Sequence, residues 1–198
     1  MMLNALLLVI TIVFFVVYII EVKKVKFSIR TIFLIALFSS ISYVLNMIKF
    51  IRMPQGGAIT LFSVLPVMVI SIIYGRGIGF TCGILSGILK TLDGAIFLNP
   101  LQFILDYILA NMSLGFAGIF GRSNKIKIIL GCALGGFISL CFNVLSGVVF
   151  FGEFAPSGAN IWIYSILYNF SSIGVELILT VVVIGFMPLD RIIKNIKA

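Results

Sequence analysis

The sequence predicts an all-α integral membrane protein with about seven transmembrane helices. Of its 198 residues, 62% are apolar and only 10% are charged, against roughly 45–50% and 25% in soluble domains. A membrane-spanning helix needs about 20 mostly apolar residues. Seven such segments take up most of the chain, so no room is left for a soluble domain.

Seven apolar runs follow one another, separated by turn signals such as Pro54-Gln55-Gly56-Gly57 and Asn99-Pro100. The first run, residues 2–20, has its positive charges after it and no small-residue cleavage site, so we expect a retained helix and not a signal peptide. The other predicted helices cover residues 31–48, 58–74, 77–92, 101–120, 128–151 and 161–187. The spacing Gly83-x-x-x-Gly87 favours close helix packing.

The basic residues predict the orientation in the cell membrane. Only Lys49, Arg52 and Lys90 fall on one side, whereas eleven fall on the other: Lys23, Lys24, Lys26, Arg30, Arg76, Arg122, Lys125, Lys127, Arg191, Lys194 and Lys197. Cytoplasmic loops carry the excess of Lys and Arg. We therefore expect a multi-pass protein of the plasma membrane whose N-terminus lies outside and whose C-terminus is cytoplasmic. The net charge of +8 then reflects topology and not binding to nucleic acid.

Several classes of chemistry lack the residues that they need. The chain has no histidine, and its three cysteines lie singly in apolar runs, so the sequence predicts no metal site and no histidine-based catalytic triad. No phosphate-binding G-x-x-x-x-G-K-[ST] loop is present, and no cofactor motif. We expect no catalytic residues, no cofactor, and no ATP hydrolysis by this chain alone.

Two acids lie inside predicted spanning segments and need an explanation. A carboxylate near a helix centre costs about 2.5–3.5 kcal/mol on insertion scales, so such an acid faces a partner, a cavity or a ligand. Asp106, followed by Tyr107 and preceded by Gln102 on the same face, is suited to hold a small cationic or hydrogen-bonding ligand from outside. The alternative is a structural pair with a base such as Lys90. Glu176 lies seven residues after Asn169 and is equally compatible with a structural or a functional role.

Asn143, Gly147 and Phe151 form one stripe at helical spacing toward the outer end of the sixth segment. A polar group, a gap and an aromatic ring on one stripe suit a flat heterocyclic ligand, because the aromatic ring can stack on the heterocycle while the amide forms a hydrogen bond with it. The alternative is that the small residue admits a neighbouring helix. Tyr164 and Asn169 lie near the start of the last segment and would point about 140° apart on an ideal helix. Both side chains can therefore reach one ligand only if the pocket wraps around the end of the helix or if Tyr164 lies before the regular helix begins.

Four ordered motifs resemble a known family. They are Met53-Pro54-Gln55-Gly56-Gly57-Ala58-Ile59-Thr60-Leu61 with Pro66, Asn99-Pro100-Leu101-Gln102-Phe103-Ile104-Leu105-Asp106-Tyr107, the stretch from Ser146 to Pro156, and Trp162-Ile163-Tyr164-Ser165 with Tyr168-Asn169. They resemble the thiamine-specific substrate-binding (S) component of energy-coupling factor (ECF) transporters. The resemblance runs from about Arg30 to the C-terminus.

This resemblance implies a six-helix S-component membrane domain, residues 29–198, preceded by one additional transmembrane helix, residues 1–28. It implies thiamine binding at the outer side and association with a membrane coupling (T) component and two cytoplasmic ATPases. The implied substrate-binding residues are Asp106, Tyr107, Asn143, Gly147, Phe151, Tyr164 and Asn169. Ala36-x-x-x-Ser40 matches the small-residue spacing that docks against the coupling component.

The chain also departs from the family's pattern at three positions. Asn143 stands where the family usually has histidine, and Phe151 and Gly57 stand where some members have tryptophan. Fewer aromatic faces leave open a smaller ligand, such as a hydroxymethylpyrimidine-like thiamine precursor, or another vitamin. A self-sufficient secondary transporter stays an alternative, although no internal repeat is found. A membrane enzyme is disfavoured because the six acids are dispersed.

Overall fold

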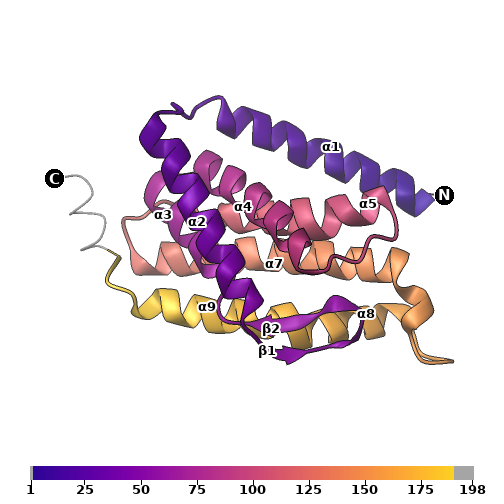
Figure 1. Cartoon of the computed structure of the whole chain (residues 1–198). Coiled ribbons are helices and arrows are strands. Elements are labelled where there is room, and N and C mark those ends of the chain that lie inside the picture. Colours follow the sequence, from indigo (N-terminus) through magenta and orange to yellow (C-terminus); the bar gives the residue numbers. More distant parts are fainter. Residues whose placement is uncertain (1, 190–198) are drawn as a thin grey trace.

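The structure, a computed structural model, describes residues 2–189 (Figure 1). Within this range the helices form seven rods. Five of the rods are single helices: α1 (Met2–Val22), α2 (Ile29–Met47), α3 (Leu65–Tyr74), α4 (Arg76–Lys90) and α7 (Lys125–Phe150). The predicted basic residues Arg191, Lys194 and Lys197 lie outside the described residues.

The other two rods are continuous but not uniform. One comprises α5 (Pro100–Phe103), a first π turn (Ile104–Leu109), α6 (Ala110–Ser113) and a 3-10 segment (Leu114–Gly118); we call it the fifth rod. The last rod comprises α8 (Ile161–Asn169), a second π turn (Phe170–Gly174) and α9 (Val175–Phe186). Because π turns insert an extra residue into a helix, they redirect side chains and frequently mark functional sites.

The third predicted helix begins later than expected, because residues 49–60 form a hairpin. Strand β1 (Lys49–Arg52) pairs antiparallel with β2 (Ala58–Thr60) around a short 3-10 turn (Pro54–Gly56). Gln55 and Gly56 both adopt positive φ there. The run 58–74 is almost uniformly apolar, and periodicity cannot separate a strand from a buried helix in such a run. Short 3-10 turns also occur at Thr91–Asp93 and Gly152–Phe154.

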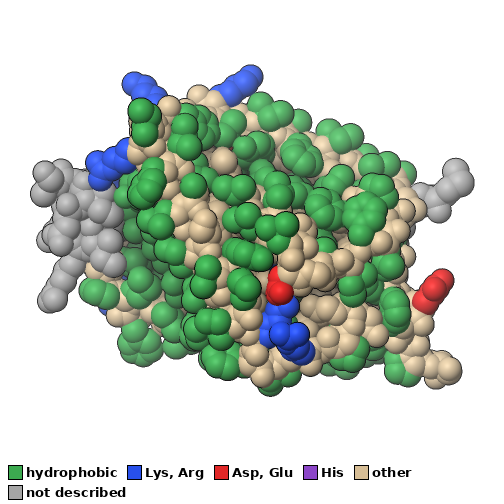
Figure 2. All heavy atoms as spheres, in the orientation of Figure 1, with side chains coloured by type: hydrophobic (Ala, Val, Ile, Leu, Met, Phe, Trp, Pro, Cys, Tyr) green, Lys and Arg blue, Asp and Glu red, His purple; other side chains and the backbone are tan. Residues whose placement is uncertain are grey.

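The helix lengths fit a membrane protein. Five described rods are long and apolar enough to cross a bilayer: Asn4–Val22, Ile29–Met47, Pro100–Gly118, Lys125–Phe150 and Ile161–Phe186. Figure 2 shows apolar side chains over most of the visible face. α3 rises only about 15 Å, half of the roughly 30 Å hydrocarbon core, and its residues 66–73 are all buried. The bundle therefore has space in the half beyond the start of α3.

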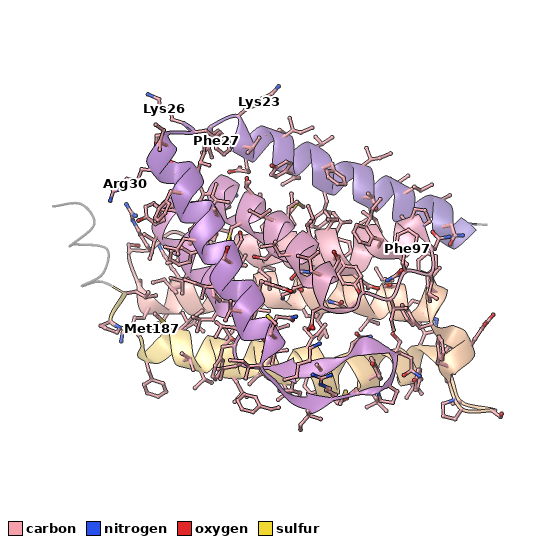
Figure 3. All side chains as sticks on the ribbon, in the orientation of Figure 1. Lys23, Lys26, Phe27, Arg30, Phe97 and Met187 are labelled. Atoms are coloured by element: carbon pink, nitrogen blue, oxygen red, sulfur yellow. The ribbon has the colours of Figure 1, made fainter. Side chains whose placement is uncertain are left out.

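The two ends of the bundle differ in character. Lys23, Lys26 and Arg30 lie where α1 joins α2, at the same end as Met187, and Phe97 lies at the opposite end (Figure 3). This separation is the one that the predicted topology requires, with basic turns at one end and the Asp93–Pro100 loop at the other.

Small residues bring the helices close together, as their spacing predicts. A Cβ at Gly83 would collide with the carbonyl oxygen of Asn111, and one at Gly87 with that of Tyr107, so α4 packs directly on the fifth rod. Ala36 and Ser40, by contrast, lie on the exposed side of α2, away from the buried Ile35, Ser39 and Ser42.

Candidate functional site

A cavity of about 250 Å³ lies in the half of the bundle beyond the start of α3. The hairpin, the loop after α4, the fifth rod, α7 and the last rod all contribute to its wall. All seven residues predicted to bind substrate line it: Asp106, Tyr107, Asn143, Gly147, Phe151, Tyr164 and Asn169. The structure thus brings together residues that are up to 63 positions apart in the sequence.

Asp106 lies in the first π turn and faces the cavity. Its Oδ2 accepts a hydrogen bond of 2.8 Å from Nε2 of the buried Gln102, one turn earlier, as the sequence suggests. Lys90 is not its partner, because Lys90 Nζ donates to Ser63 Oγ at 3.2 Å and to Asn111 Oδ1 at 3.0 Å. Among residues 2–189 Asp106 forms no ion pair. The alternative of a structural Asp106–Lys90 pair is therefore wrong.

Tyr107 holds the neighbouring loop in place. Its hydroxyl accepts a hydrogen bond of 3.2 Å from the backbone N–H of Ile96, and its ring packs at 5.3 Å from that of Phe103. Gln102 supports the same loop, since its Nε2 also donates to the carbonyl oxygen of Ile96 and its Oε1 accepts from the N–H of Leu98. The residues around Asp106 thus fix one wall of the cavity.

The stripe on α7 contains a polar group, a small residue and a ring, in that order outward. Asn143 donates through Nδ2 to the carbonyl oxygen of Ser139 at 2.8 Å. A Cβ at Gly147 would collide with the hydroxyl of Ser165, which donates to the carbonyl oxygen of Val144. Gly147 therefore admits α8, in agreement with the packing alternative, although it also lines the cavity.

Tyr164 and Asn169 both line the cavity from the last rod, although Tyr164 lies within regular helix. The cavity thus wraps around this side of α8. Asn169 is held by its own Nδ2, which donates to the carbonyl oxygens of Ser165 at 2.9 Å and Asn143 at 3.3 Å. The ring of Tyr164 lies 6.1 Å from that of Tyr168.

Glu176 has a structural environment that sequence reasoning does not reveal. Its carboxylate is buried and accepts four hydrogen bonds: from N and Oγ1 of Thr60 at 3.2 and 2.7 Å, from Oγ of Ser63 at 2.9 Å and from N of Val64 at 3.4 Å. It therefore joins α9 to the end of the hairpin and the start of α3. No hydrogen bond connects it to Asn169 in the described range.

Two further contacts join the hairpin to other parts of the cavity wall, and sequence reasoning missed both. The hydroxyl of Tyr168 accepts a hydrogen bond of 2.9 Å from the N–H of Gly57 and donates to the carbonyl oxygen of Pro54. A Cβ at Gly57 would collide with that hydroxyl. Lys49 forms an ion pair of 2.5 Å with Asp93 and so ties the hairpin to the loop after α4. The sequence signals for Tyr168 are its position one turn after Tyr164 and its place beside Asn169 in the fourth motif, and neither indicates its partners in the hairpin.

The arrangement suits non-covalent binding. In the part of the chain that the structure describes, no three Cys, His, Asp or Glu residues gather where they would hold a metal ion. The ionisable lining consists of three acids, Asp93, Asp106 and Glu176, and two bases, Lys49 and Lys90. With all five ionised, the cavity carries one negative charge in excess. An isolated charge in such a wall favours a ligand of opposite charge.

Comparisons with known proteins also indicate a protein that binds a small molecule. A family model described as Thiamine transporter protein (Thia_YuaJ) matches residues 32–195. The chain is similar to Thiamine transporter ThiT of Bacillus subtilis, with 32% identity over 181 residues that cover 83% of this chain and 94% of the relative. It is 37% identical over 121 residues to Thiamine transporter ThiT of Lacticaseibacillus paracasei, covering 55% of this chain and 60% of that relative.

The fold is similar to a solved one as well. The structure of ThiT from Listeria monocytogenes superimposes with a TM-score of 0.71 and 28% sequence identity, covering 81% of this chain and 93% of that chain. The family model covers more than three quarters of the sequence, and five described rods are long and apolar enough to cross a membrane, so this chain is a multi-pass membrane protein that belongs to the thiamine transporter family.

Proposed function

We propose that the protein binds thiamine in the cavity of about 250 Å³ and serves as the substrate-capture subunit of an ECF-type transporter. The observation that carries the proposal is Asp106, a cavity acid that forms no ion pair within residues 2–189 and whose carboxylate accepts a single hydrogen bond there, from Gln102, whereas Glu176 accepts four. Thiamine is a cation that also carries an aminopyrimidine. The amino group of the pyrimidine donates hydrogen bonds, which a carboxylate accepts.

The other lining residues suit the remaining parts of thiamine. The side-chain oxygens of Asn143 and Asn169 accept no hydrogen bond from the described residues, so they are available to a ligand. The rings of Phe151 and Tyr164 offer faces to the thiazolium, because a cation is attracted to the negative face of an aromatic ring. Tyr107 and Gly147 complete the wall beside them. Binding of this kind makes and breaks no covalent bond.

The transport step requires partners. This chain has no nucleotide-binding loop, so energy for uptake comes in this proposal from a membrane coupling component with two cytoplasmic ATPases. The exposed side of α2 at Ala36 and Ser40 is the proposed docking surface, since small residues let two helix backbones approach closely in lipid. Residues 29–198 form the S-component domain in this proposal, and residues 1–28 form the additional helix.

The proposed orientation places the cavity outside and the basic turns in the cytoplasm. The α1–α2 turn with Lys23, Lys26 and Arg30 lies at the end of the bundle opposite Phe97 (Figure 3). Since basic loops remain cytoplasmic, the part of the cavity wall formed by the hairpin and the loop after α4 then faces the extracellular medium. Thiamine enters from that side.

The test is a calorimetric titration of the purified full-length protein with thiamine, its phosphates and its hydroxymethylpyrimidine precursor. We expect thiamine to bind with nanomolar to micromolar affinity. Absence of binding to correctly folded protein contradicts the proposal, and tighter binding of the precursor reassigns the ligand. Thiamine uptake by cells that lack the coupling component and the ATPases would instead identify a secondary transporter.

A further inference from the structure

α1 packs against the back of the segment that presents Asp106. The helix runs beside α4 and the fifth rod (Figure 1). Leu7 of α1 is fully buried, and it belongs to one apolar cluster with Leu105 and Leu109 of the first π turn. Phe80 of α4 and Phe142 of α7 belong to the same cluster. The additional helix is therefore part of the core around the cavity wall.

The first π turn has two opposite faces. Leu105 and Leu109 are 0% exposed and point into the cluster with α1, whereas Asp106 and Tyr107 line the cavity. Neighbouring residues share a backbone, so a shift of Leu105 moves Asp106 with it. A π turn is rarer and less favourable than regular helix and persists only where its surroundings hold it. α4 holds one side of this turn through Gly87, and α1 holds another.

α1 is fastened along its whole length and is not a loosely attached anchor. The ring of Phe14 packs edge-on against that of Phe142, with ring centres 4.8 Å apart. The hydroxyls of Tyr18 and Thr81 lie 3.4 Å apart, and Glu21 pairs with Arg76 at 3.0 Å. These contacts fix the depth of α1 relative to α4 and so keep Leu7 at the level of the first π turn.

We propose that α1 positions Asp106 for its ligand, with Leu7 as the positioning residue. No side chain of its residues 4–22 lines the cavity, and the helix lies outside residues 32–195, which the family model matches. Its effect is exerted through Leu105 and Leu109. This inference rests on the proposed function, because it assumes that Asp106 contacts thiamine.

The test compares two neighbouring leucines of α1. Leu7→Ala removes the buried contact, whereas Leu8→Ala removes the same atoms from a side chain that is 51% exposed. We expect Leu7→Ala to weaken thiamine binding to the full-length protein three- to tenfold, and Leu8→Ala to change it less than twofold. In an Asp106→Asn background, Leu7→Ala is expected to change affinity less than twofold, since the carboxylate that it positions is already lost.

A ligand-free measurement separates this inference from the proposed function. Hydrogen exchange of the amides of residues 105–110 is expected to accelerate at least threefold in Leu7→Ala, with no change at residues 170–174 of the second π turn. If Leu7→Ala does not fold, Leu7→Val replaces it, with an expected twofold change in each measurement. Where Asp106→Asn binds too weakly to titrate, the exchange result decides.

Two results overturn the inference. The first is that Leu7→Ala and Leu8→Ala show the same hydrogen-exchange rates at residues 105–110 and the same affinity for thiamine. The other is an equal loss of affinity with and without the Asp106 carboxylate, which indicates general loosening of the bundle. If Asp106→Asn binds thiamine as tightly as the unaltered protein, the proposed ligand contact fails, while faster exchange at residues 105–110 still shows that α1 holds the turn.

Discussion

Glu176→Gln is expected to destabilise the protein although it keeps the shape of the side chain. The carboxylate accepts on both oxygens: Oε2 from N and Oγ1 of Thr60, and Oε1 from Oγ of Ser63 and N of Val64. An amide has only one oxygen, so its nitrogen must face one of the two pairs of donors. A hydroxyl can rotate and accept instead, but a backbone N–H cannot.

The expected loss of stability follows from the number of donors that lose their acceptor. One buried backbone N–H loses its acceptor in Glu176→Gln, which costs about 1–3 kcal/mol. Glu176→Ala removes all four acceptor contacts and also the negative charge that acts on Lys90, which contacts Ser63 Oγ at 3.2 Å. Truncating a buried, hydrogen-bonded charge of this kind costs about 3–5 kcal/mol. The predicted order of stability is therefore unaltered protein, then Gln, then Ala.

The assay is thermal unfolding of the ligand-free protein in one detergent, with Glu153→Gln as the control. Glu153 is an exposed acid between α7 and α8, and surface substitutions of this type stay within about 0.5 kcal/mol. For a chain of this length about 1 kcal/mol corresponds to roughly 2–4 °C in the midpoint. A midpoint of Glu176→Gln equal to that of Glu153→Gln refutes the reasoning, because the carboxylate would then not hold the hairpin and α3.

Three further substitutions test the cavity and the packing around it. Asp106→Ala is expected to weaken thiamine binding by more than about 1 kcal/mol, or at least fivefold, in a titration in which Glu153→Ala has no effect. Gly87→Ala places a methyl group against a backbone carbonyl of the fifth rod, so it lowers stability by about 1–3 kcal/mol; Gly185→Ala, which meets only an ordinary contact at 3.6 Å, leaves the unfolding midpoint unchanged. Tyr168→Phe removes the hydroxyl that bonds to both ends of the hairpin turn, which costs about 0.5–1.5 kcal/mol and accelerates hydrogen exchange there; unchanged exchange at residues 53–58 would show that the hydroxyl does not hold the turn.

The sequence predicts the number of helical rods and the residues of the cavity wall because both depend on local patterns. Apolar runs of membrane-spanning length identify the rods. Asp106 is recognisable because a carboxylate inside such an apolar run is costly unless it faces a partner, a cavity or a ligand. The start of α3 is not predictable in this way, since β2 and the helix that follows lie in one mostly apolar run, residues 58–74, which only a few isolated polar residues such as Thr60 and Ser63 interrupt.

Long-range contacts explain what the sequence does not reveal. Glu176 is bonded to residues at least 112 positions away, and the partners of Tyr168 are at least 111 positions away. Nothing in the spacing along the last rod indicates these partners, because they depend on how the hairpin folds back over α8 and α9. The same holds for Gly57, where some members of the family have tryptophan. The glycine at this position is explained only by the hydroxyl of Tyr168, which leaves no space for a side chain there.

The short α3 explains how so apolar a chain contains a polar cavity. A helix of full length in its place would fill the half of the bundle that contains the cavity. Instead the chain reaches the start of α3 through the hairpin, whose backbone would be unsatisfied in lipid. Glu176 and Tyr168 provide acceptors for the backbone N–H groups of Thr60, Val64 and Gly57. The cavity exists because the hairpin replaces a longer helix, and the hairpin in turn needs the buried carboxylate of Glu176 as an acceptor. Glu176 is thus occupied by the hairpin, whereas Asp106 is free to contact a cation.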